Sequence, residues 1–178
     1  NVGVVPVTDS RLDKLAEVIE SNPSTSLGTS RPPVKPAVVR FVDIAGLVAG
    51  AHKGEGLGNK FLSHIREVDV MVHVVRGFGD KVDVNGDFAT VKTELELADL
   101  EHPDAPPLAK KPEIVVINVA ENELGKEKGD AIVICAKTEA ELAELSSEDA
   151  RAYLAELGIK ESGLDQIIRA AYNKLELM

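Results

Sequence analysis

Short apolar runs alternate along the chain with segments whose apolar residues recur every three or four positions. The short runs are rich in β-branched residues, which predicts strands of a buried sheet, and they cover residues 2–7, 37–42, 68–75, 114–117 and 131–135. The second pattern is typical of amphipathic helices, and it covers residues 12–19, 60–67, 91–100, 139–145, 147–157 and 164–175. This alternation predicts an α/β fold with a mostly parallel β-sheet flanked by helices.

Three of the connecting segments have the composition of loops. Residues 21–36 are rich in Ser, Thr, Pro and Gly, and residues 76–87 are rich in Gly and Asp, as is typical of turns and loops. Residues 102–112 contain four prolines, so we expect this segment to be extended and exposed.

Composition limits the class of protein. A length of 178 residues with 44% hydrophobic and 3% aromatic content predicts one domain with an aliphatic core. The net charge of −10 argues against a broad nucleic-acid-binding surface, although it leaves a local basic patch open. A single cysteine excludes an internal disulfide and a cysteine-rich zinc site, which fits a cytoplasmic protein. No apolar run approaches the roughly 20 residues of a membrane span, so we expect no membrane association.

The strand at residues 37–42 ends in a motif suited to phosphate chemistry. Asp43 follows the strand directly, Gly46 comes three residues later, and further glycines stand at positions 50, 54, 56 and 58. In P-loop NTPases an aspartate in this place holds the hydration shell of Mg²⁺. A glycine offers its N–H to the γ-phosphate without a side chain to block the approach. The sequence therefore predicts a sensor of Mg²⁺ and the γ-phosphate.

Polar residues also follow two of the other predicted strands. Asn118 comes after the run at 114–117, and Cys135, Ala136 and Lys137 stand at the end of the run at 131–135. Ligands of open parallel sheets bind beyond the carboxyl ends of the strands. We therefore expect these residues to share one binding site with Asp43.

Several of these motifs together resemble the YchF/Obg-like ATPase family, which consists of P-loop proteins of the translation-factor-related GTPase class. The resemblance rests on residues 43–67, 118–121 and 142–146, and it covers nearly the whole chain. It implies a P-loop NTPase-like fold, Mg²⁺, ATP as the substrate and ADP as a product. It also implies association with the ribosome and with translation or stress responses, and possible RNA contacts through regions that this sequence does not contain.

The chain departs from the family pattern in ways that bear on its domains. By that pattern we expect a Walker A loop upstream of residue 1 and a TGS domain after residue 178. The family's long helical insertion is reduced to a few residues near 101–111, and Leu124 and Gly125 stand where another helix is expected. We interpret residues 1–178 as an incomplete nucleotide-binding domain of a larger protein.

The choice of base depends on residues 118–121. Related GTPases have Asn-Lys-x-Asp here, whereas this chain has Glu121, one methylene longer, and Val119 in place of the lysine. Adenine has one amino donor and a ring acceptor, so it cannot donate twice to a carboxylate as guanine does. The resemblance implies ATP over GTP, with Asn118 contacting adenine through its amide, Val119 through its backbone, and residues 135–137 through backbone N–H groups. The alternatives are that Asn118 caps a loop, that Glu121 is a solvated carboxylate, and that Cys135 is a small buried hydrophobe.

Hydrolysis is expected to be slow. Leu47 occupies the place where many GTPases carry the glutamine that orients the attacking water, and leucine cannot form that hydrogen bond. His52 and His64 are candidates to supply the missing group, and the alternative is that both are surface histidines. His73 lies within an apolar strand, so we expect a hydrogen-bonded core residue there.

Two other functions stay open at this point. One is a GTP-preferring switch of the same fold, in which Glu121 acts as the shorter aspartate does. The other is a non-catalytic interaction module, which applies if the protein has no phosphate-binding loop.

Overall fold

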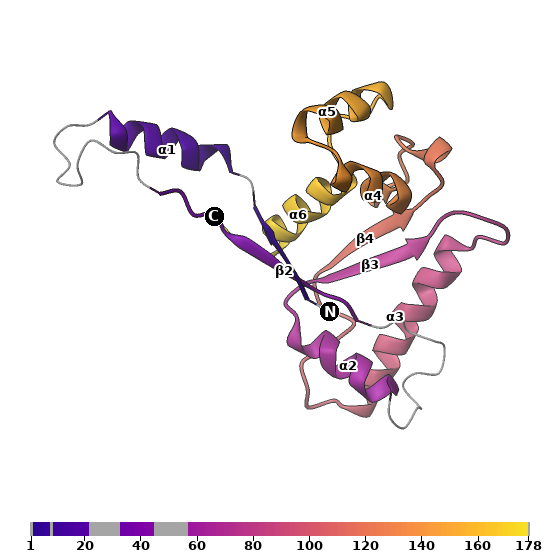
Figure 1. Ribbon diagram of the computed structural model, residues 1–178. Coiled ribbons are helices and arrows are strands. Elements are labelled where there is room, and N and C mark those ends of the chain that lie inside the picture. Colours follow the sequence, from indigo (N-terminus) through magenta and orange to yellow (C-terminus); the bar gives the residue numbers. More distant parts are fainter. Residues whose placement is uncertain (1, 8, 22–32, 45–56, 178) are drawn as a thin grey trace. The chain divides into compact units, whose positions relative to one another are not determined.

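A computed structural model describes residues 2–7, 9–21, 33–44 and 57–177 (Figure 1). The chain divides into two compact units, Asn1–Asp43 and Ile44–Met178. Each unit is described by itself.

The first unit is an antiparallel pair of strands with a helix in the connection between them. Strand β1 (Val2–Pro6) pairs with β2 (Val38–Val42), so that Val2 lies opposite Val42. Helix α1 (Ser10–Glu20) begins after Asp9, whose carboxylate accepts a hydrogen bond from the Arg11 N–H at 2.9 Å. The parallel βαβ arrangement expected for this part is therefore wrong. A helix in the connection is compatible with either strand direction, because a long connection lets the chain turn back.

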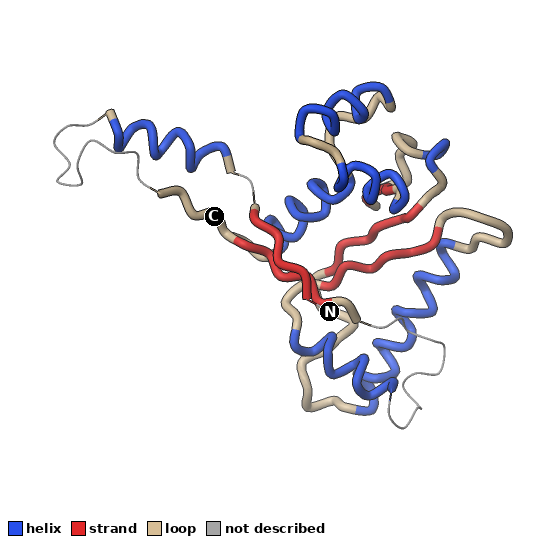
Figure 2. Tube along the Cα trace, in the orientation of Figure 1, coloured by secondary structure: helices blue, strands red, loops and turns tan. Residues whose placement is uncertain are grey.

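The second unit contains a three-stranded parallel sheet, as the apolar runs predicted. Its strands are β3 (Met71–Arg76), β4 (Glu113–Asn118) and β5 (Ile132–Ile134), in the order β3-β4-β5 (Figure 2). In the register of the sheet, Arg76 lies opposite Asn118, and Asn118 lies opposite Ile134. The carboxyl ends of the three strands consequently meet at one edge of the sheet.

Helices pack against this sheet. Helix α3 (Val84–Glu101) contacts β3, whereas α6 (Gly163–Lys174) contacts both β4 and β5. Helix α3 begins seven residues earlier than predicted because the Asp83 carboxylate caps it, accepting from the Gly86 N–H at 2.9 Å. The helices of this unit are α2 (Leu57–Glu67), α3 (Val84–Glu101), α4 (Ala136–Glu144), α5 (Ser147–Glu156) and α6 (Gly163–Lys174), with a short 3-10 turn, η2, at Glu121–Glu123.

The four prolines of the segment between α3 and β4 are exposed, as predicted, whereas Leu108 within the same segment is buried. Leu108 is only 1% exposed and packs with residues of α2 and α3 such as Ile65 and Leu95. The Asp99 carboxylate accepts hydrogen bonds from the N–H groups of Leu108 at 2.7 Å and Ala109 at 2.9 Å. The prolines of this segment have no backbone N–H to donate. The Asp99 carboxylate of α3 accepts from two of the N–H groups that the other residues provide.

His73 in β3 lies against an aromatic ring. Its imidazole stacks on Phe88 of α3, with 5.0 Å between ring centroids. Burial lowers the pKa of His73 below 6.5, while the nearby Glu113 carboxylate acts in the opposite direction. The neutral imidazole is therefore the form that the folded chain prefers.

This preference predicts a pH dependence of stability. Because the pKa of His73 is lower in the folded state, the unfolded state binds the proton first as the pH falls through 6.5. The free energy of unfolding should fall between about pH 7.5 and pH 5.5, and His73→Phe, which keeps a ring on Phe88, should reduce that loss. Urea denaturation at both pH values measures it, and an equal loss in the two proteins would contradict this role of His73.

Candidate functional site

The central contact of the site joins the end of β4 to the start of α4. Asn118 is the last residue of β4, and its side-chain Oδ1 accepts a hydrogen bond from the Ala136 N–H at 3.0 Å. Ala136 is the first residue of α4, and Cys135 is the N-cap residue before it. Two of the residues predicted for one site are thus in direct contact, across 18 positions of sequence.

Backbone hydrogen bonds fix the strand ends around Asn118. The Gly77 N–H donates to the Asn118 carbonyl at 2.7 Å, and the Val119 N–H donates to the Ile134 carbonyl at 2.7 Å. A Cβ on Gly77 would stand 2.5 Å from Ile117 Cγ2 and 3.1 Å from the Asn118 carbonyl oxygen. Sequence reasoning placed Gly77 in an ordinary loop, although a glycine directly after a buried strand was the signal for this close approach.

Val119 and Cys135 are buried as whole residues, at 2% and 4% exposed. The Val119 N–H is bonded to the Ile134 carbonyl. The burial of Cys135 agrees with the interpretation that it is a small hydrophobe.

Glu121 and Lys137 form an ion pair beside this contact. Glu121 begins η2, Lys137 lies in the first turn of α4, and Lys137 Nζ stands 3.2 Å from Glu121 Oε2. The same ammonium lies 3.6 Å from Glu141 Oε1, one turn further along α4. The hydrogen bond to Glu121 is the main reason that the pKa of Lys137 is raised. Glu121 is therefore an exposed carboxylate that is also paired with Lys137.

The remaining predicted residues are distributed over both units or lie outside the described residues. Asp43 follows β2 as an exposed residue at the end of the first unit. His64 is exposed on α2, next to the buried Ile65. Gly46, Leu47 and His52 lie outside the described residues.

The described ranges lack a metal-binding cluster and a membrane-spanning helix. There, no group of three His, Cys, Asp or Glu residues could hold a metal ion. In those same ranges, no helix combines the length and the apolar character that crossing a bilayer requires.

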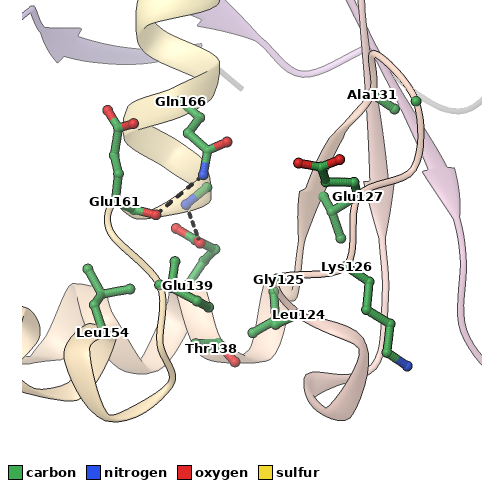
Figure 3. A pocket seen from close by; sticks show the side chains of 14 residues that line it. Leu124, Gly125, Lys126, Glu127, Ala131, Thr138, Glu139, Leu154, Glu161 and Gln166 are labelled. Carbon is green, nitrogen blue, oxygen red and sulfur yellow. Dashed lines mark hydrogen bonds between the residues drawn. The ribbon is translucent and has the colours of Figure 1, made fainter.

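A cavity of about 370 Å³ lies next to the N-terminal ends of α4 and α6 (Figure 3). Glu139 of α4 caps α6: its carboxylate accepts from the N–H groups of Gly163 at 2.7 Å and Leu164 at 3.1 Å. The cavity is lined by Leu124, Gly125, Lys126, Glu127, Gly129, Ala131, Val133, Thr138, Glu139, Leu154, Ile159, Glu161, Gly163 and Gln166.

The close packing at Gly77 gives a direct test of the strand ends. Gly77→Ala should reduce the free energy of unfolding by about 1–3 kcal/mol, because its Cβ would push against Ile117 and the Asn118 carbonyl. The control is Gly3→Ala in β1, where an added Cβ meets nothing within 4 Å. Equal stability of the two variants in urea denaturation would show that the strand ends are not packed in this way.

Comparison with known proteins places the fold in a defined group. A model of the family described as "50S ribosome-binding GTPase" matches residues 10–119. The solved structure of the Schizosaccharomyces pombe YchF GTPase has a TM-score of 0.70 and 24% sequence identity, covering 98% of this chain and 65% of that one. This likeness in structure confirms the predicted α/β fold of the P-loop class.

Sequence relatives extend the similarity to the whole chain. The ribosome-binding ATPase YchF of Bacillus subtilis is 36% identical over 253 residues, which cover 99% of this chain and 66% of the relative. The proteins of the same name from Escherichia coli O157:H7 and Mycoplasma genitalium are 33% and 35% identical, over 99% of this chain and 66% of their own. The predicted resemblance to YchF is confirmed, and the chain spans 66% of the length of these relatives. Because the first alignment is longer than the 178 residues of this chain, that relative contains internal segments without a counterpart here.

Proposed function

Since the chain belongs to the 50S ribosome-binding GTPase family, we propose that it is a nucleotide-dependent switch that binds ATP in preference to GTP. The observation that best supports this proposal is the contact of Asn118 with Ala136, which sets an amide side chain between the carboxyl ends of two parallel strands. Ligands of open parallel sheets bind at such strand ends. The proposed reaction is slow hydrolysis of ATP to ADP, because Leu47 replaces a water-orienting glutamine.

The base would meet a set of groups that favours adenine. With Asn118 Oδ1 bonded to Ala136, the two N–H bonds of the Asn118 amide remain to donate to a ring nitrogen. The Val119 carbonyl can accept from the exocyclic amino group of adenine. Guanine would require both oxygens of a carboxylate for its two donors, whereas one oxygen of Glu121 is engaged by Lys137. The Asn118 amide and the Val119 carbonyl suit adenine, and the pairing of Glu121 with Lys137 disfavours guanine.

Magnesium would be held at the phosphate end. Asp43 offers one exposed carboxylate at a strand end, which fits a Mg²⁺ ion that keeps several waters and binds mainly through nucleotide phosphates. The ion would neutralise phosphate charge, and Asp43 would position its water shell. From the sequence we also propose that Gly46 contacts the γ-phosphate. His64 is proposed as the group that helps to orient the attacking water.

The names of the sequence relatives support a proposal about the partners and the domains of the protein. Because the relatives are named ribosome-binding ATPases, we include the ribosome among the proposed partners. We also propose that residues 1–178 form an incomplete nucleotide-binding domain, and that a Walker A loop and a TGS domain belong to the complete protein.

Competition binding with ATP and GTP in the presence of Mg²⁺ tests the proposal. We expect tighter binding of ATP, a loss of affinity for both nucleotides in Asn118→Ala, and a shift towards GTP in Glu121→Asp. Asn173→Ala, an exposed asparagine of α6, is the matched control and should bind like the parent chain.

The family description as a GTPase supports the competing function, a GTP switch. Equal or tighter binding of GTP by the parent chain would favour that function and refute the preference for adenine. Binding of neither nucleotide would support a non-catalytic interaction module.

A further inference from the structure

A continuous series of polar contacts runs from the proposed base site to helix α5. Glu121 Oε2 lies 3.2 Å from Lys137 Nζ, and Lys137 Nζ lies 3.6 Å from Glu141 Oε1. The other oxygen of that carboxylate, Glu141 Oε2, accepts a hydrogen bond from the Tyr153 hydroxyl at 2.9 Å. The four side chains come from η2, α4 and α5.

We propose that Lys137 determines base specificity by occupying the Glu121 carboxylate, and that Glu141 and Tyr153 are positioning residues that hold the ammonium there. This inference rests on the proposed nucleotide-binding function. It gives the Lys137 side chain a role beyond the backbone contact that the sequence predicted.

The specificity follows from how a carboxylate recognises guanine. Guanine presents two N–H donors side by side, and an ionised carboxylate accepts both with its two oxygens. In this chain Glu121 Oε2 accepts from Lys137, and the ammonium also neutralises the charge that would strengthen a second bond. Lys137 therefore weakens guanine recognition, while adenine, which has no such pair of donors, loses little.

Glu141 and Tyr153 are needed because Lys137 is long and its side chain is 70% exposed. An exposed ion pair is weak when the lysine is free to adopt other rotamers. Here two carboxylates flank one ammonium, and the Tyr153 hydroxyl restrains the second of them. The pKa of Lys137 is raised, first by Glu121 and then by Glu141, and that of Tyr153 is raised mainly by its bond to Glu141, as this arrangement requires.

A tyrosine titration tests the contacts without any nucleotide. The chain has two tyrosines, Tyr153 and Tyr172, and Tyr153→Phe assigns their ultraviolet signals. Glu141→Gln should lower the pKa of Tyr153, because the carboxylate that disfavours the tyrosinate is gone. An unchanged pKa of Tyr153 would show that the hydrogen bond to Glu141 is not formed, and would overturn the positioning role.

The specificity is tested by the ratio of ATP to GTP dissociation constants, measured on the whole chain. Lys137→Met should improve GTP binding relative to ATP by about two- to five-fold, and Glu141→Gln and Tyr153→Phe should act in the same direction by less. Adding Glu121→Gln to Lys137→Met should cancel the gain. The matched control is Lys126→Met, whose ammonium pairs with Glu123 at 3.0 Å and should not change the ratio.

An unchanged ratio in Lys137→Met, with both nucleotides still bound, would overturn the role of Lys137 and leave the proposed function standing. If the parent chain binds neither nucleotide, the proposed function fails and the specificity role fails with it. The tyrosine titration still reports the contacts in that case, so the two failures are distinguishable.

Discussion

The hydrogen bond from the Ala136 N–H to Asn118 Oδ1 is the interaction on which the site depends. It joins the end of a central strand to the start of a helix, and it determines which groups of the Asn118 amide face outward. The close approach of Gly77 to the Asn118 carbonyl and the bond from Val119 to Ile134 hold the neighbouring backbone in register. Without the Asn118 contact, the first turn of α4 would lose its side-chain hydrogen bond to the end of β4.

Charge pairing around this contact would account for the proposed preference for adenine in a site with the connectivity of a GTPase. The carboxylate that corresponds to the guanine-reading group is present, but it lies in an ion pair. The preference for ATP over GTP would then have two sources. One is the Lys137 ammonium, which competes with guanine for the Glu121 carboxylate, and the other is the length of the Glu121 side chain. Two glutamates of α4 form separate contacts: Glu139 caps α6, and Glu141 connects Lys137 to Tyr153.

Features set by local sequence could be predicted, and features set by contacts distant in sequence could not. Runs of β-branched residues identified the five strands found in the described part of the chain, and Asn118 and Ala136 were placed at one edge because parallel strands end together. The antiparallel pairing of β1 with β2 was missed because a connecting helix does not fix strand direction. The burial of Leu108 was missed because it depends on Asp99, nine positions away.

The central claim is that nucleotide binds at the carboxyl ends of β4 and β5. It is tested most directly by following backbone amide chemical shifts while Mg²⁺ and ATP are added to the ¹⁵N-labelled chain. Among the residues that the structure describes in its second unit, the largest changes should fall on Asn118, Val119, Ala136 and Lys137, with small changes in the outer turns of α5. Changes centred elsewhere in that unit, or no changes at saturating ATP, would contradict the account.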